Sequence, residues 1–266
     1  MKEHAVELAQ NEGSPADKLN ILREYLQAFV MRSLHESEAY TCLSFVGGTA
    51  LRFAFYLPRF SEDLDFSLEN PVGYEPTRWM KKLKRDMVLA GFDITLSWND
   101  RKTVHMAWIK VAGLLRDAGL SAMENENLSI KLEIDSSPPA GAETVRTVIN
   151  RHLMFAVRHH SLPSLMAGKV HALMTRKYSK GRDWYDLLWY MSRRPPTEPN
   201  LILLQNALDQ TQGKETYRAE NWREMLREKV QVMNFSQLLQ DVEPFLEHPQ
   251  DARLLTADHF QSILVA

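Results

Sequence analysis

The chain has 266 residues, a formal net charge of −2 at pH 7, and 44% hydrophobic and 25% charged residues, which is the composition of an ordinary globular protein rather than a polycation. Its one cysteine, Cys42, excludes an internal disulfide and fits a reducing cytoplasm. The sequence has no Cys/His zinc spacing, no apolar signal-peptide core, and no apolar run near the roughly 20 residues of a membrane span. We therefore expect a cytoplasmic protein with no membrane partner.

The first 160 residues contain both predicted helices and predicted strands, without a regular alternation of the two. Apolar residues at helical spacing predict helices over 17–37, 49–57 and 76–90, the last with lysine and arginine on its outer face. Strand-like runs follow, over 92–98, 104–111, 128–135, 145–149 and 154–157. In the run 128–135 apolar and polar residues alternate, so we expect one of its faces to be buried.

The rest of the chain has helical spacing. Helices are predicted over 161–176 and 183–193, and Pro195-Pro196 marks a boundary after them. Short helices follow, over about 199–212, 217–232, 235–247 and 256–264. This order fits an α+β fold, in which a mixed or antiparallel β-sheet with flanking helices is followed by a C-terminal helical bundle. We expect one domain over 1–160, with an N-terminal helix, and a mostly helical region over 161–266.

Charge is distributed unevenly along the chain. Residues 143–194 contain ten Lys and Arg against three Asp and Glu, whereas residues 195–266 contain six against eleven. A basic middle segment of this kind could bind a triphosphate or a nucleic-acid backbone, although a solvated surface explains the same composition.

The segment from Phe45 to Ser67 carries the clearest chemical signal. It reads as a strand, a Gly47-Gly48 turn, a short helix, a tight loop and a second strand with Asp63 and Asp65 on one face. Two adjacent carboxylates repel each other unless a cation lies between them, and carboxylate oxygens are ligands that Mg²⁺ prefers. The glycine turn allows close backbone approach, and the helix after it can direct N–H groups at phosphate. The pattern predicts metal-assisted chemistry on a nucleotide; the alternative is a charged strand edge.

A third carboxylate is expected from the run 128–135. Glu133 and Asp135 share one face of that strand, so either could complete a metal site or act as a general base. An amphipathic strand with a solvated polar side explains them equally well. Near the acidic pair, Ser61 could donate its hydroxyl to a phosphate oxygen or could simply form a turn.

Two later residues are weaker candidates. Lys169 borders the apolar stripe of the helix 161–176, where a cation could clamp a triphosphate or extend to solvent along the surface. Asp183 reads as the N-cap of the next helix, and Asp186 would favour the helix dipole. That structural explanation is sufficient for both aspartates.

In this order and at these separations, the segments resemble the AbiEii-type, or MenT-like, nucleotidyltransferase toxins of type IV toxin–antitoxin and abortive-infection systems. These belong to the DNA polymerase β-like nucleotidyltransferase superfamily. The first family motif matches Gly47-Gly48-Thr49-Ala50-Leu51 and then Arg59-Phe60-Ser61-Glu62-Asp63-Leu64-Asp65-Phe66. The later motifs, a helical lysine and an Arg-Asp helix start, match Lys169 and Arg182-Asp183-Trp184-Tyr185-Asp186-Leu187. The resemblance spans roughly residues 40–195, and the tail beyond them carries no matching motif.

The resemblance implies a nucleotidyltransferase-like fold and assigns roles to individual residues. Asp63 and Asp65 would hold Mg²⁺. The strand 128–135 would add the third carboxylate, for which we take Glu133 while Asp135 stays an alternative. Lys169 and Asp183 would be catalytic together with the acidic pair. The nucleotide would contact Gly47, Gly48, Thr49, Ser61 and Lys169.

The implied reaction transfers a nucleoside monophosphate from an NTP to an acceptor hydroxyl and releases pyrophosphate. In related toxins the acceptor is the 3′ end of tRNA, so translation stops, and a cognate antitoxin accompanies the toxin in defence against phage. Two alternatives remain at this stage. One is a transferase that modifies a small molecule or a protein, and the other is a non-catalytic module that binds an NTP.

Overall fold

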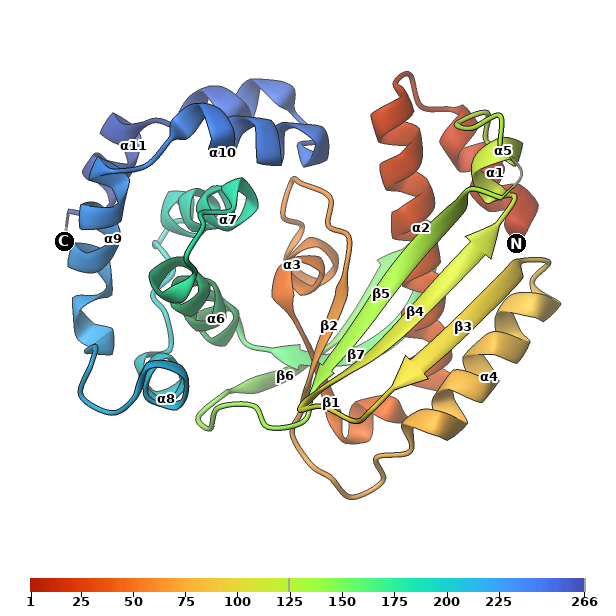
Figure 1. Cartoon of the computed structure of the whole chain (residues 1–266), viewed down its shortest axis with the longest axis horizontal. Coiled ribbons are helices and arrows are strands. Elements are labelled where there is room, and N and C mark those ends of the chain that lie inside the picture. Colours follow the sequence, from red (N-terminus) through yellow and green to blue (C-terminus); the bar gives the residue numbers. More distant parts are fainter. Residues whose placement is uncertain (124, 266) are drawn as a thin grey trace. The chain divides into compact units, whose positions relative to one another are not determined.

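The computed structural model describes residues 1–123 and 125–265, and its centre is a seven-stranded mixed β-sheet (Figure 1). The strand order across the sheet is β3-β4-β5-β2-β1-β7-β6. The strands are β1 (Leu43–Val46), β2 (Leu64–Leu68), β3 (Asp93–Asn99), β4 (Val104–Ala112), β5 (Asn127–Asp135), β6 (Thr144–Arg151) and β7 (Leu153–His160). The predicted α+β class is confirmed, because β2 pairs parallel with β5 but antiparallel with β1.

The chain divides into two compact units that are interleaved in sequence. The first unit comprises Met1–Phe55, Phe60–Pro138 and Val145–His159, and it contains nearly all of the sheet. The second comprises Tyr56–Arg59, Pro139–Thr144 and His160–Ala266. Two short segments therefore belong to the second unit although both of their chain neighbours belong to the first.

Helices of the first unit cover the sheet. They are α1 (Lys2–Gln10), α2 (Pro15–Glu36), α3 (Gly47–Phe55), α4 (Pro76–Leu89) and the short α5 (Leu114–Asp117). Helix α2 begins at Pro15 because the side chain of Ser14 accepts a hydrogen bond from the backbone N–H of Asp17 at 3.0 Å, which satisfies an N-terminal donor. Helix α1 was not predicted, because its segment is polar and short.

Helix α4 has the amphipathic arrangement that its sequence predicts. Its apolar side chains are buried, namely Trp79, Met80, Leu83 and Met87. Its lysines and arginines lie on the outer, solvent side. Strand β5 is likewise half-buried, because Leu128, Ile130, Leu132 and Ile134 are all inaccessible while the residues between them are partly exposed.

The second unit is a helical bundle, as expected for the C-terminal half. Its helices are α6 (Leu162–Thr175), α7 (Gly181–Ser192), α8 (Leu201–Gln212), α9 (Trp222–Gln231), α10 (Phe235–Val242) and α11 (Ala257–Ile263). Trp184 of α7 is buried against Phe260 of α11, with ring centroids 5.1 Å apart. At the start of α7, a Cβ on Gly181 would lie 2.0 Å from the carbonyl oxygen of Leu238, so only glycine permits this contact between α7 and α10.

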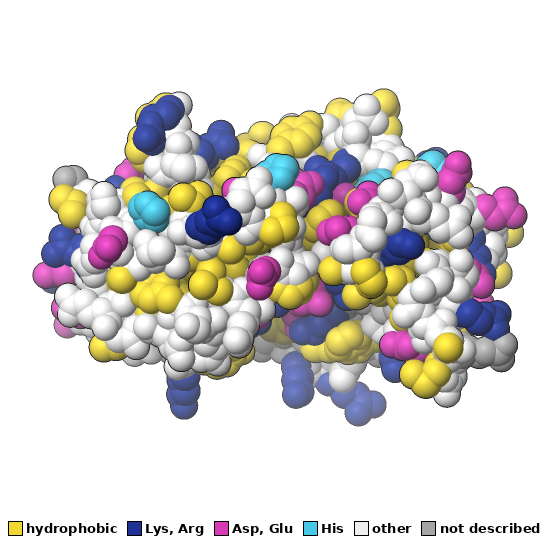
Figure 2. Space-filling model, turned by 90° about the horizontal axis from the view of Figure 1, so that it is seen from above, with side chains coloured by type: hydrophobic (Ala, Val, Ile, Leu, Met, Phe, Trp, Pro, Cys, Tyr) yellow, Lys and Arg dark blue, Asp and Glu magenta, His cyan; other side chains and the backbone are white. Residues whose placement is uncertain are grey.

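None of the helices among the described residues is long and apolar enough to span a membrane. On the face of the molecule shown in Figure 2, acidic and basic side chains are interspersed with hydrophobic ones, in keeping with the small net charge.

Candidate functional site

The junction between β1 and α3 brings the backbone against a carboxylate. Gly47 has φ of +77°, and a Cβ at this position would lie 2.3 Å from Oδ2 of Asp65. Only glycine tolerates both the conformation and the approach. Gly47, which the sequence places in a turn, is thus the first residue of α3. Its lack of a side chain leaves space for the carboxylate of Asp65. The hydroxyl of Thr49 donates a short hydrogen bond to the backbone carbonyl of Asp63, which fixes the start of α3 to the acidic segment.

The acidic segment itself differs slightly from the prediction. Strand β2 begins at Leu64, so Asp65 lies within the strand and Asp63 immediately precedes it. Leu64 and Phe66 are buried, as alternation requires, while Asp63 and Asp65 are half-buried. Before them, the buried side chain of Gln27 donates to the carbonyl oxygens of Ser61 at 3.0 Å and Glu62 at 2.9 Å. Helix α2 thereby holds the loop that leads into the acidic pair.

The register between β2 and β5 distinguishes the two carboxylates left open by the sequence. Asp65 pairs with Glu133, whereas Asp135 pairs with Ser67. Directly paired residues of neighbouring strands project to the same face, so Glu133 is the carboxylate beside Asp65. Sequence periodicity could not separate the two because both lie on one face of the same strand.

A lysine lies among these carboxylates. The ammonium of Lys131 is 2.7 Å from Oε2 of Glu133. Partial burial opposes the charge of Lys131, but the hydrogen bond to Glu133 and the charges of Glu133, Asp63 and Asp65 outweigh it and raise the pKa of the lysine. Three carboxylates therefore act on one ammonium. Sequence reasoning gave Lys131 no role, although it stands two residues before Glu133.

This donor set fits a hard divalent cation. The carboxylates of Asp63 and Asp65 supply the oxygen ligands that Mg²⁺ prefers, and together with Glu133 they already stabilise a positive charge. Among the described residues, no three or more Asp, Glu, His or Cys side chains lie close enough together to hold a metal ion. The assignment of Asp63, Asp65 and Glu133 as metal ligands stays a prediction.

The second unit contains a separate buried charge network around Lys169. The ammonium of this residue lies 2.8 Å from Oδ1 of Asp183 and 2.8 Å from Oδ2 of Asp186. Arg176, just after α6, also bonds to Asp183. Burial disfavours the charge on Lys169, but the two carboxylates outweigh it and raise its pKa. Burial would likewise raise the pKa of Asp183, but Lys169 and Arg176 lower it. Lysine and aspartate are therefore both ionised.

Asp186 is more than a helix-dipole residue. It is completely buried, and its two oxygens accept from Nε and Nη2 of Arg59, each at 2.6 Å. Asp183 is not the N-cap of α7 as predicted, because the helix begins at Gly181 and Lys180 is its N-cap. Sequence reasoning missed the roles of Arg59, Asp186 and Arg176. The position of Arg59 in the first family motif was the available signal.

The candidate residues thus form two groups. The first unit holds Gly47, Gly48, Thr49, Ser61, Asp63, Asp65 and Glu133. The second unit holds Lys169 and Asp183, which contact each other.

Residues 29–264 match the family model described as nucleotidyl transferase AbiEii toxin, type IV toxin–antitoxin system. No curated protein matches the chain. Two crystal structures from Helicobacter pylori are among the solved structures that match this chain. One is a protein described as a candidate nucleotidyltransferase, with a TM-score of 0.54 and 18% identity over 90% of this chain and 93% of the other. The second is JHP933, with a TM-score of 0.48 and 18% identity over 90% and 91% of the two chains.

Proposed function

Because this chain belongs to the AbiEii family of nucleotidyl transferase toxins of type IV toxin–antitoxin systems, we propose that it transfers a nucleoside monophosphate from an NTP to the 3′ hydroxyl of tRNA. Transfer to that hydroxyl would prevent aminoacylation and block translation. The family also implies a cognate antitoxin as a partner.

The observation that carries this proposal is the cluster of carboxylates beside Gly47. Asp63 and Asp65 would hold Mg²⁺, and Glu133 would be the third ligand. When bound, Mg²⁺ supplies positive charge that neutralises the triphosphate. The hydroxyl of Ser61 and the start of α3 at Gly47, Gly48 and Thr49 would contact phosphate oxygens.

The acceptor oxygen forms a bond to the α-phosphorus, and the bond from that phosphorus to the bridging oxygen breaks. Pyrophosphate leaves with the electron pair, and the proton of the acceptor hydroxyl passes to a carboxylate, for which Glu133 is the candidate base. Positioning and charge stabilisation provide most of the catalysis in such transfers.

Lys169 would act as a phosphate-binding cation rather than as a base. Its raised pKa keeps the ammonium charged at neutral pH, and the two buried aspartates fix its position. Asp183 would position Lys169 and contribute to catalysis. Its lowered pKa keeps it anionic, so it cannot serve as a general acid at neutral pH.

The test incubates the purified protein with Mg²⁺ and each of the four labelled NTPs, in separate pools of tRNA, protein and metabolites. We expect label in the tRNA pool with one preferred NTP. Asp63→Asn and Lys169→Met should lower the transfer rate by about 10²–10³-fold, which is typical for the loss of one preorganised charge. The matched pair Glu133→Gln and Asp135→Asn tests the register, since only the first should lower the rate.

Label in the protein or metabolite pool would contradict tRNA as the acceptor but would still support nucleotidyltransferase activity. NTP binding without transfer to any pool would contradict the enzyme. In cells, expression should slow growth, and Asp63→Asn should relieve the effect. A wild-type protein as harmless as this variant would contradict the toxin assignment.

A further inference from the structure

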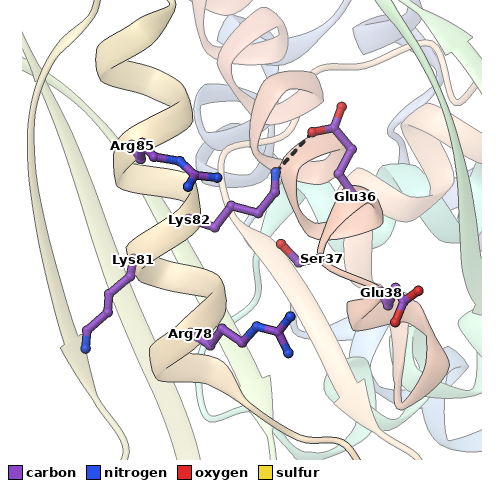
Figure 3. Close-up of a pocket in the computed structure, with 7 residues that line it drawn as sticks. All are labelled: Glu36, Ser37, Glu38, Arg78, Lys81, Lys82 and Arg85. Carbon is purple, nitrogen blue, oxygen red and sulfur yellow. Dashed lines mark hydrogen bonds and ion pairs between the residues drawn. The ribbon is translucent and has the colours of Figure 1, made fainter.

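The outer side of α4 forms a charged groove with the end of α2, shown in Figure 3, to which the proposed chemistry gives no role. This α4 groove has a volume of about 730 Å³. Its basic wall consists of Arg78, Lys81, Lys82 and Arg85, and its opposite wall consists of Glu36, Ser37 and Glu38. We propose that the α4 groove binds the sugar–phosphate backbone of RNA, as a contact remote from the reacting atoms. The choice of RNA rests on the proposed function.

The four cations form one continuous stripe because they stand at positions i, i+3, i+4 and i+7 of α4. Figure 3 shows that Arg78, Lys82 and Arg85 extend toward α2, while Lys81 extends away from it. Positive charge therefore lies both on the side of α4 that faces α2 and on the side that faces away from it (Figure 3). Like charges four residues apart cost an isolated helix about 0.2–0.5 kcal/mol per pair, so helix stability does not favour this arrangement.

The acidic neighbours neutralise this charge only in part. Lys82 pairs with Glu36 at 3.0 Å and with Asp86 at 2.5 Å. The side chains of Arg78 and Arg85 are 80% and 69% exposed, so their ion pairs with Glu75 and Asp86 contribute little. Among the residues that the structure describes, Lys81 makes no ion pair. A ligand carrying several phosphates could engage Arg78, Lys81 and Arg85 without breaking a strong internal bond.

The groove continues into two neighbouring hollows, which favours a polymer over a single small anion. One hollow shares Arg78 and Lys81 with it and is also lined by Tyr74 and by two acidic residues, Glu75 and Asp100. The other shares Glu38 and is lined by Arg146 and Arg158. A linear ligand could follow this path and meet cations in all three hollows, as a nucleic-acid backbone does when it contacts Lys and Arg.

The chemistry of the wall favours RNA over an acidic protein. All seven residues that line the α4 groove are charged or polar. Protein–protein interfaces need a desolvated apolar core, which such a wall cannot supply, whereas phosphate contacts need only charge and hydrogen-bond donors. Helices α2 and α4 cover the apolar face of the sheet, and Asp65 and Glu133 project from its other face. The groove would therefore contact a part of the RNA far from its reacting end.

The test uses the full-length protein and fluorescently labelled total tRNA. Binding is measured by anisotropy over a series of KCl concentrations for wild type and for the variant Lys81→Gln/Arg85→Gln. We expect the variant to bind at least about tenfold more weakly. The slope of log K against log salt should become shallower by about 2, because each lost phosphate contact removes nearly one unit.

The matched control is Lys84→Gln/Lys110→Gln, which removes two exposed cations outside the groove and changes the net charge equally. Thermal unfolding confirms that both double variants fold. The control should bind tRNA like wild type. The proposal would be overturned if both double variants bound tRNA equally weakly, or if neither bound it more weakly than wild type. Binding of poly-glutamate that depends on the groove, with tRNA binding unaffected, would overturn it in favour of an acidic protein.

The nucleotide-transfer assay keeps this inference separate from the proposed function. If label enters only metabolites while tRNA binding still depends on the groove, tRNA is not the acceptor, but the groove is still an RNA-binding surface. If tRNA takes label but the two double variants bind it equally, the groove is not an RNA-binding surface, while nucleotide transfer to tRNA is supported.

Discussion

Gly47 limits where the carboxylate of Asp65 can lie, so we predict that Gly47→Ala removes the proposed metal site. The new Cβ would collide with Oδ2 of Asp65, 2.3 Å away, and a left-handed alanine costs about 1–2 kcal/mol. We expect a lower free energy of unfolding by roughly that amount, together with a loss of Mn²⁺ binding measured by calorimetry on the protein without nucleotide.

The control for this change is Gly168→Ala. Gly168 lies inside α6, and a Cβ on it would meet nothing within 4 Å. Alanine is a better helix former, so this variant should be more stable by about 0.5–1 kcal/mol and should bind Mn²⁺ like wild type. If Gly47→Ala kept full Mn²⁺ binding, the close approach to Asp65 would have no functional meaning.

At the scale of elements, a charge network ties α2, α3 and the β6–β7 turn together. Glu24 of α2 is buried, and its carboxylate lies 2.6 Å from Arg52 and 2.8 Å from both Arg151 and His152. Burial alone would raise the pKa of Glu24, but the hydrogen bond from His152 and the charges of Arg52 and Arg151 lower it from 4.5 to about 2. A carboxylate whose pKa is lower in the folded state than in the unfolded state stabilises the fold at every pH above its unfolded-state pKa.

We predict that Glu24 contributes stability on the order of 3 kcal/mol, fully present above pH 4.5 and lost as the pH falls from 4.5 to about 2. Glu24→Gln should lower the free energy of unfolding at pH 7 by about 3–5 kcal/mol, because it leaves Arg52 buried without its carboxylate. It should also make the free energy of unfolding depend less on pH between pH 4.5 and about 2. Urea unfolding at several pH values measures both effects.

Glu7→Gln on α1 is the matched control for Glu24, because the side chain of Glu7 is 73% exposed. Its free energy of unfolding should stay within about 0.5 kcal/mol of wild type. An equally small change for Glu24→Gln would contradict a stabilising role for the network.

The elements themselves were largely predictable, because each depends on a local pattern. Alternation in β5 identified its buried face, and helical spacing identified α4 and its exposed cations. Pairing between elements was not predictable in the same way. Asp186 had a sufficient local explanation at the start of α7, whereas its actual partner, Arg59, is 127 residues away in the sequence. The choice of Glu133 over Asp135 as the neighbour of Asp65 likewise required the register of two strands.

At the scale of the whole molecule, the two compact units cannot be separated by one cut of the chain. Tyr56–Arg59 belongs to the second unit, although the residues before and after it belong to the first. This short segment carries Arg59, which donates two hydrogen bonds to the buried carboxylate of Asp186 within the second unit. The second unit therefore depends on a residue encoded about a hundred positions before its main part begins.

We predict that Arg59→Met destabilises the second unit by about 3–5 kcal/mol, because it removes two hydrogen bonds and a positive charge from the buried carboxylate of Asp186. Urea unfolding measures the loss, and hydrogen exchange of peptides from α6 and α7 locates it. The double variant Arg59→Met/Asp186→Leu should recover most of the stability, since an apolar pair can replace a buried ion pair. Arg32→Met, which breaks an exposed pair with Glu36, should cost only about 0.3–0.5 kcal/mol. A double variant no more stable than Arg59→Met would show that the loss comes from packing rather than from the unpaired charge.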